Sequence, residues 1–150
     1  MPIHNPEAVA PPTRQFFVSC DHGGGGVINE LSWLGYRLNS ATDYAIMHFR
    51  LPNDFTALTS VKVILFPITT GSFDWTANTV FAANGETWQL NSGSATADNQ
   101  AGTHITYLEL DISAAFAGVA ANDIVHVVFT LDALHTTTEV EVVGLDVKYA

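Results

Sequence analysis

Six histidines are the residues of this 150-residue sequence that could most readily carry chemistry. An imidazole binds zinc or transfers a proton close to neutral pH. A compact metal site needs several His, Cys or carboxylate ligands at short spacing, and the sequence contains no H-x-H, H-x-x-x-H or C-x-x-C motif. We therefore predict structural or incidental roles for the histidines, and we expect neither a metal site nor a cofactor. They are His4, His22, His48, His104, His126 and His135.

Nucleophilic catalysis has equally little support in the sequence. No G-x-S-x-G motif is present to expose a serine on a sharp turn. Cys20 is the only cysteine of the sequence, so no disulfide can form within the chain, and no base with an orienting residue is recognisable around it. We expect Cys20 to be a small buried thiol, and we predict that the protein is not an enzyme.

Two segments could bind an ion, yet each lacks part of the usual pattern. The four glycines at 23–26 are followed by neither a helix start nor a Lys-Ser/Thr pair, which a phosphate loop needs. We interpret them as a flexible turn or as a close backbone approach at a subunit contact. Asp98-Asn99-Gln100 is rich in oxygen, but the glycine spacing and terminal glutamate of a calcium loop are missing.

Aromatic side chains give the best ligand hypothesis. Trp33, Trp75, Trp88 and Tyr36 could form a platform on which sugar rings stack, as carbohydrate-binding modules require. The alternative is that Trp75 and Trp88 face each other across a hairpin and stabilise it as a cross-strand pair. The sequence leaves both interpretations open.

Alternation of apolar and polar residues with period two predicts that β-strands position these side chains. Turn signals recur every eight to twelve residues or so, and no segment is long enough for the helix of a parallel crossover. We predict an all-β fold, an antiparallel two-sheet jelly-roll-like β-sandwich of about eight to ten strands. The expected strands are 14–19, 33–38, 43–51, 60–70, 73–82, 86–90, 104–112, 124–131 and 138–149.

The connections between these strands carry expectations of their own. The dipeptide Asn84-Gly85 suits a tight hairpin that joins 73–82 to 86–90. Residues 91–102 are small and polar, so we expect a surface loop there. Residues 113–121 hold enough apolar side chains for a single helical turn.

Residues 1–13 are predicted to form an extended arm ahead of a sandwich domain at 14–150. The arm holds four of the six prolines of the sequence, and it is either a free terminus or a tether that becomes ordered on a neighbouring subunit. It has neither the basic start nor the apolar run of a secretion signal, so we expect the protein to reside first in the cytoplasm. The prolines of this assembly arm are Pro2, Pro6, Pro11 and Pro12.

Composition and charge exclude several classes of partner. Apolar residues make up 47% of the sequence and charged residues only 13%, and the net charge is -10. An acidic protein repels the phosphates of nucleic acids and of anionic membranes, and the longest apolar runs are far shorter than the roughly 20 residues of a membrane span. We expect neither nucleic acid nor membrane as a partner. A weakly charged exterior favours contact with other protein surfaces.

Three parts of the sequence carry a resemblance to a known group of proteins. It covers residues 43–150 and leaves 1–42 uncovered. The segments are FRLPNDF at 49–55 with LTSVKV at 58–63, LDISAAF at 110–116 with AND at 121–123 and FT at 129–130, and VGLDVKY at 143–149. With these segments the sequence resembles the small jelly-roll virion proteins of tailed bacteriophages, of the capsid decoration, cement or head-fibre type.

The resemblance implies a structural role without chemistry. Such a protein assembles in the host cytoplasm, becomes part of the virion surface, is often a homotrimer and docks on a major capsid protein or another virion protein. Its partners would be copies of itself and that virion protein. The alternative is a carbohydrate-binding module that uses exposed aromatic side chains, with a glycan as its partner.

Overall fold

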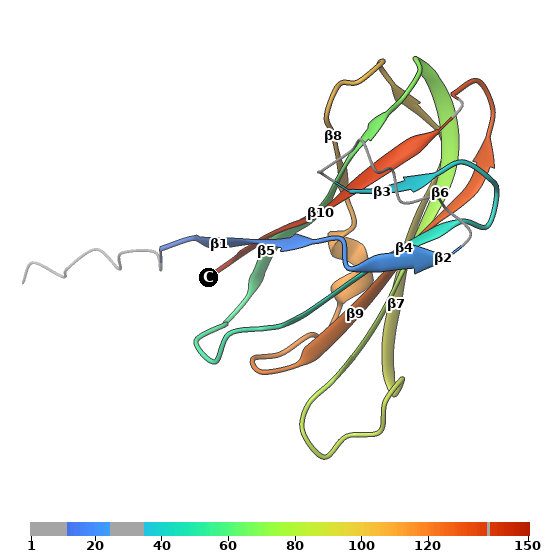
Figure 1. Ribbon diagram of the computed structural model, residues 1–150. Coiled ribbons are helices and arrows are strands. Elements are labelled where there is room, and N and C mark those ends of the chain that lie inside the picture. Colours follow the sequence, from blue (N-terminus) through green and yellow to red (C-terminus); the bar gives the residue numbers. More distant parts are fainter. Residues whose placement is uncertain (1–11, 25–34, 138) are drawn as a thin grey trace, which may run out of the picture.

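Residues 12–24, 35–137 and 139–150 are described by the computed structural model, and they form two antiparallel five-stranded sheets (Figure 1). The strands are β1 (Arg14–Ser19), β2 (His22–Gly24), β3 (Tyr36–Leu38), β4 (Tyr44–Arg50), β5 (Leu58–Pro67), β6 (Gly71–Ala82), β7 (Asn91–Gly102), β8 (Leu108–Asp111), β9 (Ile124–Leu134) and β10 (Val140–Tyr149). A single 3₁₀ turn, η1 (Ser113–Phe116), lies where one helical turn is predicted. Within these ranges no helix has the length and hydropathy to cross a lipid bilayer.

The order of the strands confirms the predicted jelly roll. One sheet runs β1-β10-β5-β8, with β3 also paired to β10, and the other runs β2-β4-β9-β6-β7. The antiparallel pairs are nested along the chain, because β6 pairs with β7, β5 with β8, β4 with β9, and β1 with β10. A long hairpin wrapped over two facing sheets gives this pattern, which is that of a double-sheet jelly roll.

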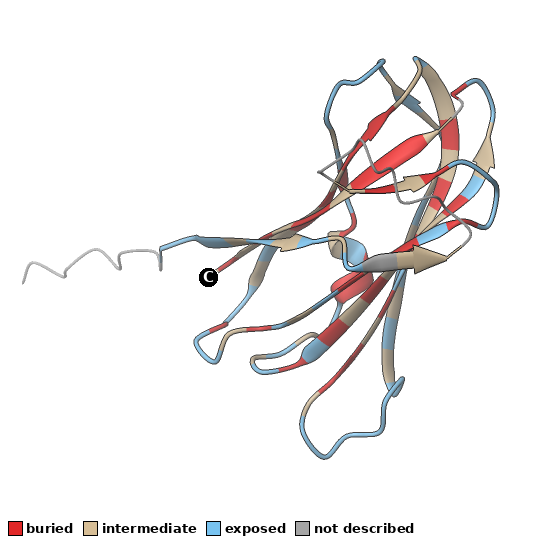
Figure 2. Cartoon of the chain, in the orientation of Figure 1, coloured by how far each residue is buried: buried red, intermediate tan, exposed pale blue. Residues whose placement is uncertain are grey.

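The apolar faces of the two sheets enclose one core. On β4 the predicted alternation is correct, since Ala45 and Met47 are fully buried whereas Tyr44 and His48 are exposed. Strand β9 buries Val125, Val127, Phe129 and Leu131 in the same way. Figure 2 shows that buried residues follow the strands of both sheets. Removal of this apolar surface from water, at about 25 cal/mol per Å², drives the two sheets together.

The prediction of a surface loop at 91–102 is wrong. These residues form β7, a twelve-residue strand that pairs with β6, and the predicted hairpin between 73–82 and 86–90 does not exist. Inward residues of β7 are small because η1 lies against them: a Cβ atom on Gly93 would meet the carbonyl oxygen of Ala115. Small inward residues hide the alternation that marks a strand.

The interpretation of the glycines at 23–26 as a flexible turn is wrong for the two glycines that the structure describes. Gly23 and Gly24 belong to β2 and pair with Ala45 and Tyr44. A close backbone approach is present at Gly23, but within the chain, since a Cβ atom there would lie 2.6 Å from the ring of Tyr36. Gly25 and Gly26 lie outside the described residues.

Strand β1 begins at Arg14, the first residue of the predicted domain, and the arm at 1–13 stays a prediction. Arg14 opens β1 and pairs with Tyr149, and Pro12 is exposed just before it. Pro2, Pro6 and Pro11 lie outside the described residues.

Candidate functional site

Trp75 and Trp88 have different environments and do not face each other across a hairpin, so the predicted cross-strand pair is wrong. Trp75 is on β6, only 4% exposed, and stacks on Phe129 with ring centroids 5.6 Å apart. Trp88 is in the turn at 83–90 that joins β6 to β7 and is 46% exposed. The difference arises because β6 pairs with β7, which leaves Trp88 outside the ladder.

The predicted four-residue aromatic platform is not assembled. Tyr36 is 8% exposed and Trp75 is 4% exposed, so both rings belong to the core and neither can present a face to a sugar. Trp33 lies outside the described residues. Of the platform residues that the structure describes, Trp88 alone keeps an exposed ring.

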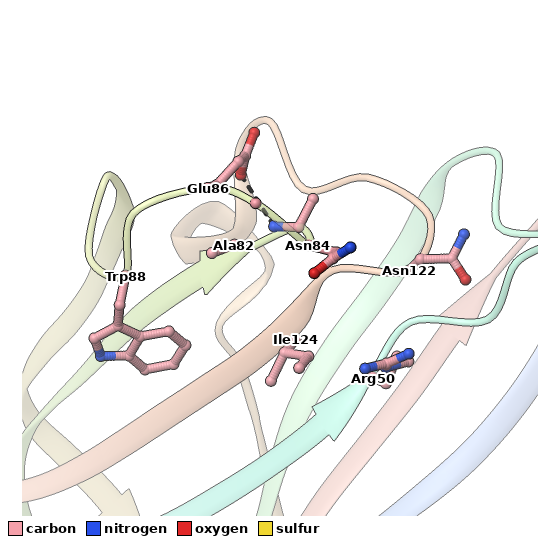
Figure 3. A pocket seen from close by; sticks show the side chains of 9 residues that line it. Arg50, Ala82, Asn84, Glu86, Trp88, Asn122 and Ile124 are labelled. Atoms are coloured by element: carbon pink, nitrogen blue, oxygen red, sulfur yellow. Dashed lines mark hydrogen bonds between the residues drawn. The ribbon is translucent and has the colours of Figure 1, made fainter.

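Trp88 borders a hollow of about 460 Å³ on the outer face of the β2-β4-β9-β6-β7 sheet, which we call the Trp88 cleft (Figure 3). Its floor follows from strand register, because Arg50 pairs with Ile124 and Ile124 pairs with Ala82 across β4, β9 and β6. Ile124 is 43% exposed, so the floor of the cleft presents an apolar side chain to solvent. The cleft is lined by Arg50, Ala82, Ala83, Asn84, Gly85, Glu86, Trp88, Asn122 and Ile124.

The turn at 83–90 holds Trp88 in place. Gly85 has a φ of 91°, in the left-handed region that glycine tolerates, and the amide of Glu86 donates to the carbonyl of Ala83 at 3.1 Å. The Glu86 carboxylate accepts hydrogen bonds from the backbone amide of Ala83 at 3.0 Å and from the side-chain amide of Asn91 at 3.3 Å. The acid at this end of the cleft is therefore engaged by its own turn.

A second, smaller hollow of about 250 Å³ also borders Trp88, over β6 and β9. The indole meets His126 edge-on, with ring centroids 6.0 Å apart and planes at 71°. Trp88 therefore lines both hollows. The smaller one is lined by Asn78, Thr79, Val80, Trp88, Gln89, His126 and Val128.

Arg50 differs from three other cations of the described residues. Arg14 pairs with Asp54, Arg37 with Glu139 at 3.0 Å and Lys62 with Glu109 at 2.8 Å. Arg50 is exposed at the end of β4 and forms no ion pair with the part of the chain that the structure describes. Its guanidinium and the Trp88 ring lie on opposite sides of Ile124 (Figure 3).

The side chains that surround Arg50 in the cleft were not predicted. Asn84 and Asn122 lie above Ile124 in Figure 3, and Asn122 adopts a φ of 67° at the turn before β9. The Asn84-Gly85 turn signal correctly marked a turn, but nothing in the sequence indicated that Asn122 would face it. Register between β6 and β9 brings them together, because Ala82 pairs with Ile124, and register is not visible in a single sequence.

Ionisable side chains form pairs in the described residues. His48 contacts Asp21 at 2.9 Å, and His135 contacts Asp74 at 2.8 Å. A hydrogen bond from the backbone amide of Asn99, assisted by His135, lowers the pKa of Asp74. Within the described ranges no group of three or more His, Cys, Asp or Glu side chains could hold a metal ion.

The thiol of Cys20 is half-buried and its sulfur lies 3.8 Å from the carbonyl oxygen of Ile46. Burial raises the pKa of this thiol to about 11. A thiolate is the reactive form of cysteine, so Cys20 is largely protonated near neutral pH.

The second surface of interest is the side of β7 that faces away from β6, which we call the β7 edge. Strand β7 ends its sheet and pairs with β6 alone. Among the described residues no backbone hydrogen bond joins its outer side to another element. The segment contains one ionisable residue, Asp98, in twelve.

No protein-family model matches the chain, and neither does any curated protein.

Proposed function

We propose that this protein is a non-enzymatic structural component that assembles with copies of itself on the surface of a larger particle, such as the capsid of a tailed bacteriophage. The observation that carries the proposal is the β7 edge. The jelly-roll fold, the low content of charged residues and the resemblance to phage decoration proteins support it.

Strand β7 lacks most of the devices that keep an edge strand from pairing with another chain. Natural edges are protected by lysines, prolines, short length or bulges. Strand β7 is twelve residues long and has no lysine or proline, and its register shift lies near Ala97, after an uninterrupted ladder from Asn91. The row Ser92, Ser94 and Thr96 offers neither charge nor bulk against a partner.

A second copy of the chain is the partner that fits this edge. Its own β7 supplies an equally long and almost uncharged strand, and antiparallel pairing of two such edges around a two-fold axis would continue the sheet. Exposed apolar side chains could add contact area between subunits or toward the particle, as at Phe17 (52% exposed), Ile105 (62%) and Tyr107 (57%). A trimer, which the resemblance implies, would place β7 against a different surface of the next subunit.

Sedimentation velocity over a range of concentrations tests the proposal. The wild-type protein is expected to sediment as an oligomer, and a chain that stays monomeric throughout contradicts the proposal. The double variant Ser92→Lys/Ser94→Lys places like charges along the β7 edge and is expected to dissociate the oligomer. The control Asn53→Lys/Thr59→Lys adds the same charge at exposed positions away from β7 and should leave the mass unchanged.

Carbohydrate binding is a second candidate function, and the Trp88 cleft favours it. A half-exposed indole, an apolar floor at Ile124 and side-chain amides at its border are the groups that bind a sugar ring. Glycan-array binding by the wild type, lost in Trp88→Ala and kept in Leu90→Ala, would support this function. Leu90 is 69% exposed in the same turn and does not line the cleft, so it is the matched control.

A further inference from the structure

We propose that the Trp88 cleft selects sugars that carry a carboxylate, and that Arg50 binds this group. The inference rests on the second candidate function and names its ligand class. It is carried by the position of Arg50 opposite Trp88 and by the absence of an ion-pair partner for Arg50 among the described residues.

The two sides of the Trp88 cleft offer a ligand different contacts, an aromatic ring on one side and a cation on the other. Trp88 stands at one side and Arg50 at the other, with Ile124 between them (Figure 3). Arg50 and Ile124 are register partners on adjacent strands, so the guanidinium rises beside an exposed apolar side chain. A sugar ring seated on Ile124 would meet the indole with its apolar face and Arg50 with a ring substituent.

Charge makes a free arginine unusual in this protein. The net charge is -10, and acids outnumber bases fifteen to five, so a surface cation ordinarily finds an acid nearby. Arg14, Arg37 and Lys62 form ion pairs, whereas Lys148, like Arg50, forms none within the described residues. Arg50 is left to bind an anion that comes from solution.

Arginine is also the side chain whose shape fits a carboxylate. Its planar guanidinium offers parallel N–H donors that match the two oxygens of the acid. The amides of Asn84 and Asn122 offer both donors and acceptors to the hydroxyl groups of the same sugar. One oxygen of the neighbouring Glu86 carboxylate already accepts hydrogen bonds from Ala83 of its own turn and from Asn91 at the start of β7.

Binding to pairs of oligosaccharides that differ only in charge tests the inference. The probes are galacturonate, glucuronate and sialic acid oligosaccharides, each compared with its methyl ester, together with neutral glycans. The wild type is expected to bind at least one acid form about ten-fold or more tightly than its ester, which corresponds to about 1.4 kcal/mol. The affinity should fall as salt concentration rises.

Variants of two cations separate the role of Arg50 from a general effect of charge. Arg50→Gln should lose the preference for the acid over the ester, and Arg50→Lys should keep part of it. The matched control is Lys148→Gln, which removes one positive charge from the opposite sheet and should leave the preference unchanged. Neutral glycans bound as tightly as acidic ones, with no effect of Arg50→Gln, would overturn the inference and leave carbohydrate binding intact. If the wild type binds none of the glycans, carbohydrate binding itself fails.

Discussion

Thr79 donates a hydrogen bond from its hydroxyl group to the backbone carbonyl of Ala115. The bond joins the middle of β6 to the 3₁₀ turn η1, and both partners are buried, Thr79 with 2% of its surface exposed. It fixes η1 against the inner faces of β6 and β7, where Gly93 leaves room for the Ala115 carbonyl. The edge that we propose for assembly therefore depends on a polar contact inside the sandwich.

Loss of the Thr79 hydroxyl should destabilise the fold. Thr79→Val keeps the shape of the side chain but leaves the Ala115 carbonyl without this donor, which costs about 1–3 kcal/mol. The free energy of unfolding from urea denaturation measures the effect. Thr79→Ser keeps the hydroxyl and should lose markedly less, so equal losses in the two variants would contradict the role of the bond.

Gly93 should tolerate no side chain. A Cβ atom would meet the Ala115 carbonyl, which belongs to the backbone and cannot swing away, so Gly93→Ala should cost about 1–3 kcal/mol. The neighbouring Ser92 is exposed, and Ser92→Ala should change stability by less than about 0.5 kcal/mol. Similar denaturation midpoints for Gly93→Ala and the wild type would show that η1 does not pack as described.

Truncation of Trp75 should destabilise the protein much more than truncation of Trp88. Trp75→Ala removes a buried ring that stacks on Phe129 and should cost about 3–5 kcal/mol. Trp88→Ala removes a half-exposed ring and should cost less than about 1 kcal/mol. Thermal and urea unfolding of both variants measure the difference, and a large loss in Trp88→Ala would contradict the exposed position of this ring.

Glu141 should make the protein less stable as the pH rises above the range of an ordinary glutamate. The residue is 1% exposed, and burial raises its pKa, with Glu139 acting in the same direction and Arg37 opposing it. The folded state therefore holds this proton more tightly than the unfolded chain, whose glutamate titrates near 4.5. The stabilisation is complete below that pH and is lost as the pH rises through the pKa of the folded state.

Glu141→Gln isolates this contribution. The variant should be at least as stable as the wild type at neutral pH and should lack the decline of unfolding free energy above pH 4.5. Asp111 has the opposite effect at low pH. Hydrogen bonds from Ser113 lower the pKa of Asp111, so the contribution of Asp111 to the free energy of unfolding is lost only as the pH falls below about 3.8. Urea denaturation across this pH range measures both the decline of stability at higher pH and its loss in acid. An unchanged decline in Glu141→Gln would rule out Glu141 as its source.

The sequence predicts the strands whose inner faces carry large apolar side chains. Strands β4 and β9 are found from their alternation because buried residues such as Met47 and Phe129 alternate with more accessible neighbours. Strand β7 is missed because Gly93, Ala95 and Ala97 face inward in place of larger residues. The alternation of these small residues with Ser and Thr was the available signal, and only η1, packed against them, explains their size.

The candidate site could be predicted only in part. The Asn84-Gly85 dipeptide predicts a turn, but the strand after the turn is β7 and not the predicted strand at 86–90. Trp88 therefore lies in the turn and not in a strand. Arg50 is predictable as an outward residue of β4, whereas its place beside Ile124 follows from strand register. Interactions between strands far apart in the chain decide both, so local sequence patterns do not contain them.

Solution mass tests the central claim most directly. Sedimentation equilibrium of the full chain, with the chain that begins at Arg14 as a second sample, gives the number of subunits without any assumption about shape. We predict an oligomer for the full chain, and dissociation on removal of residues 1–13 would add the arm to the interface. A single monomeric species at every concentration, for the full chain, would contradict assembly as the function of this protein.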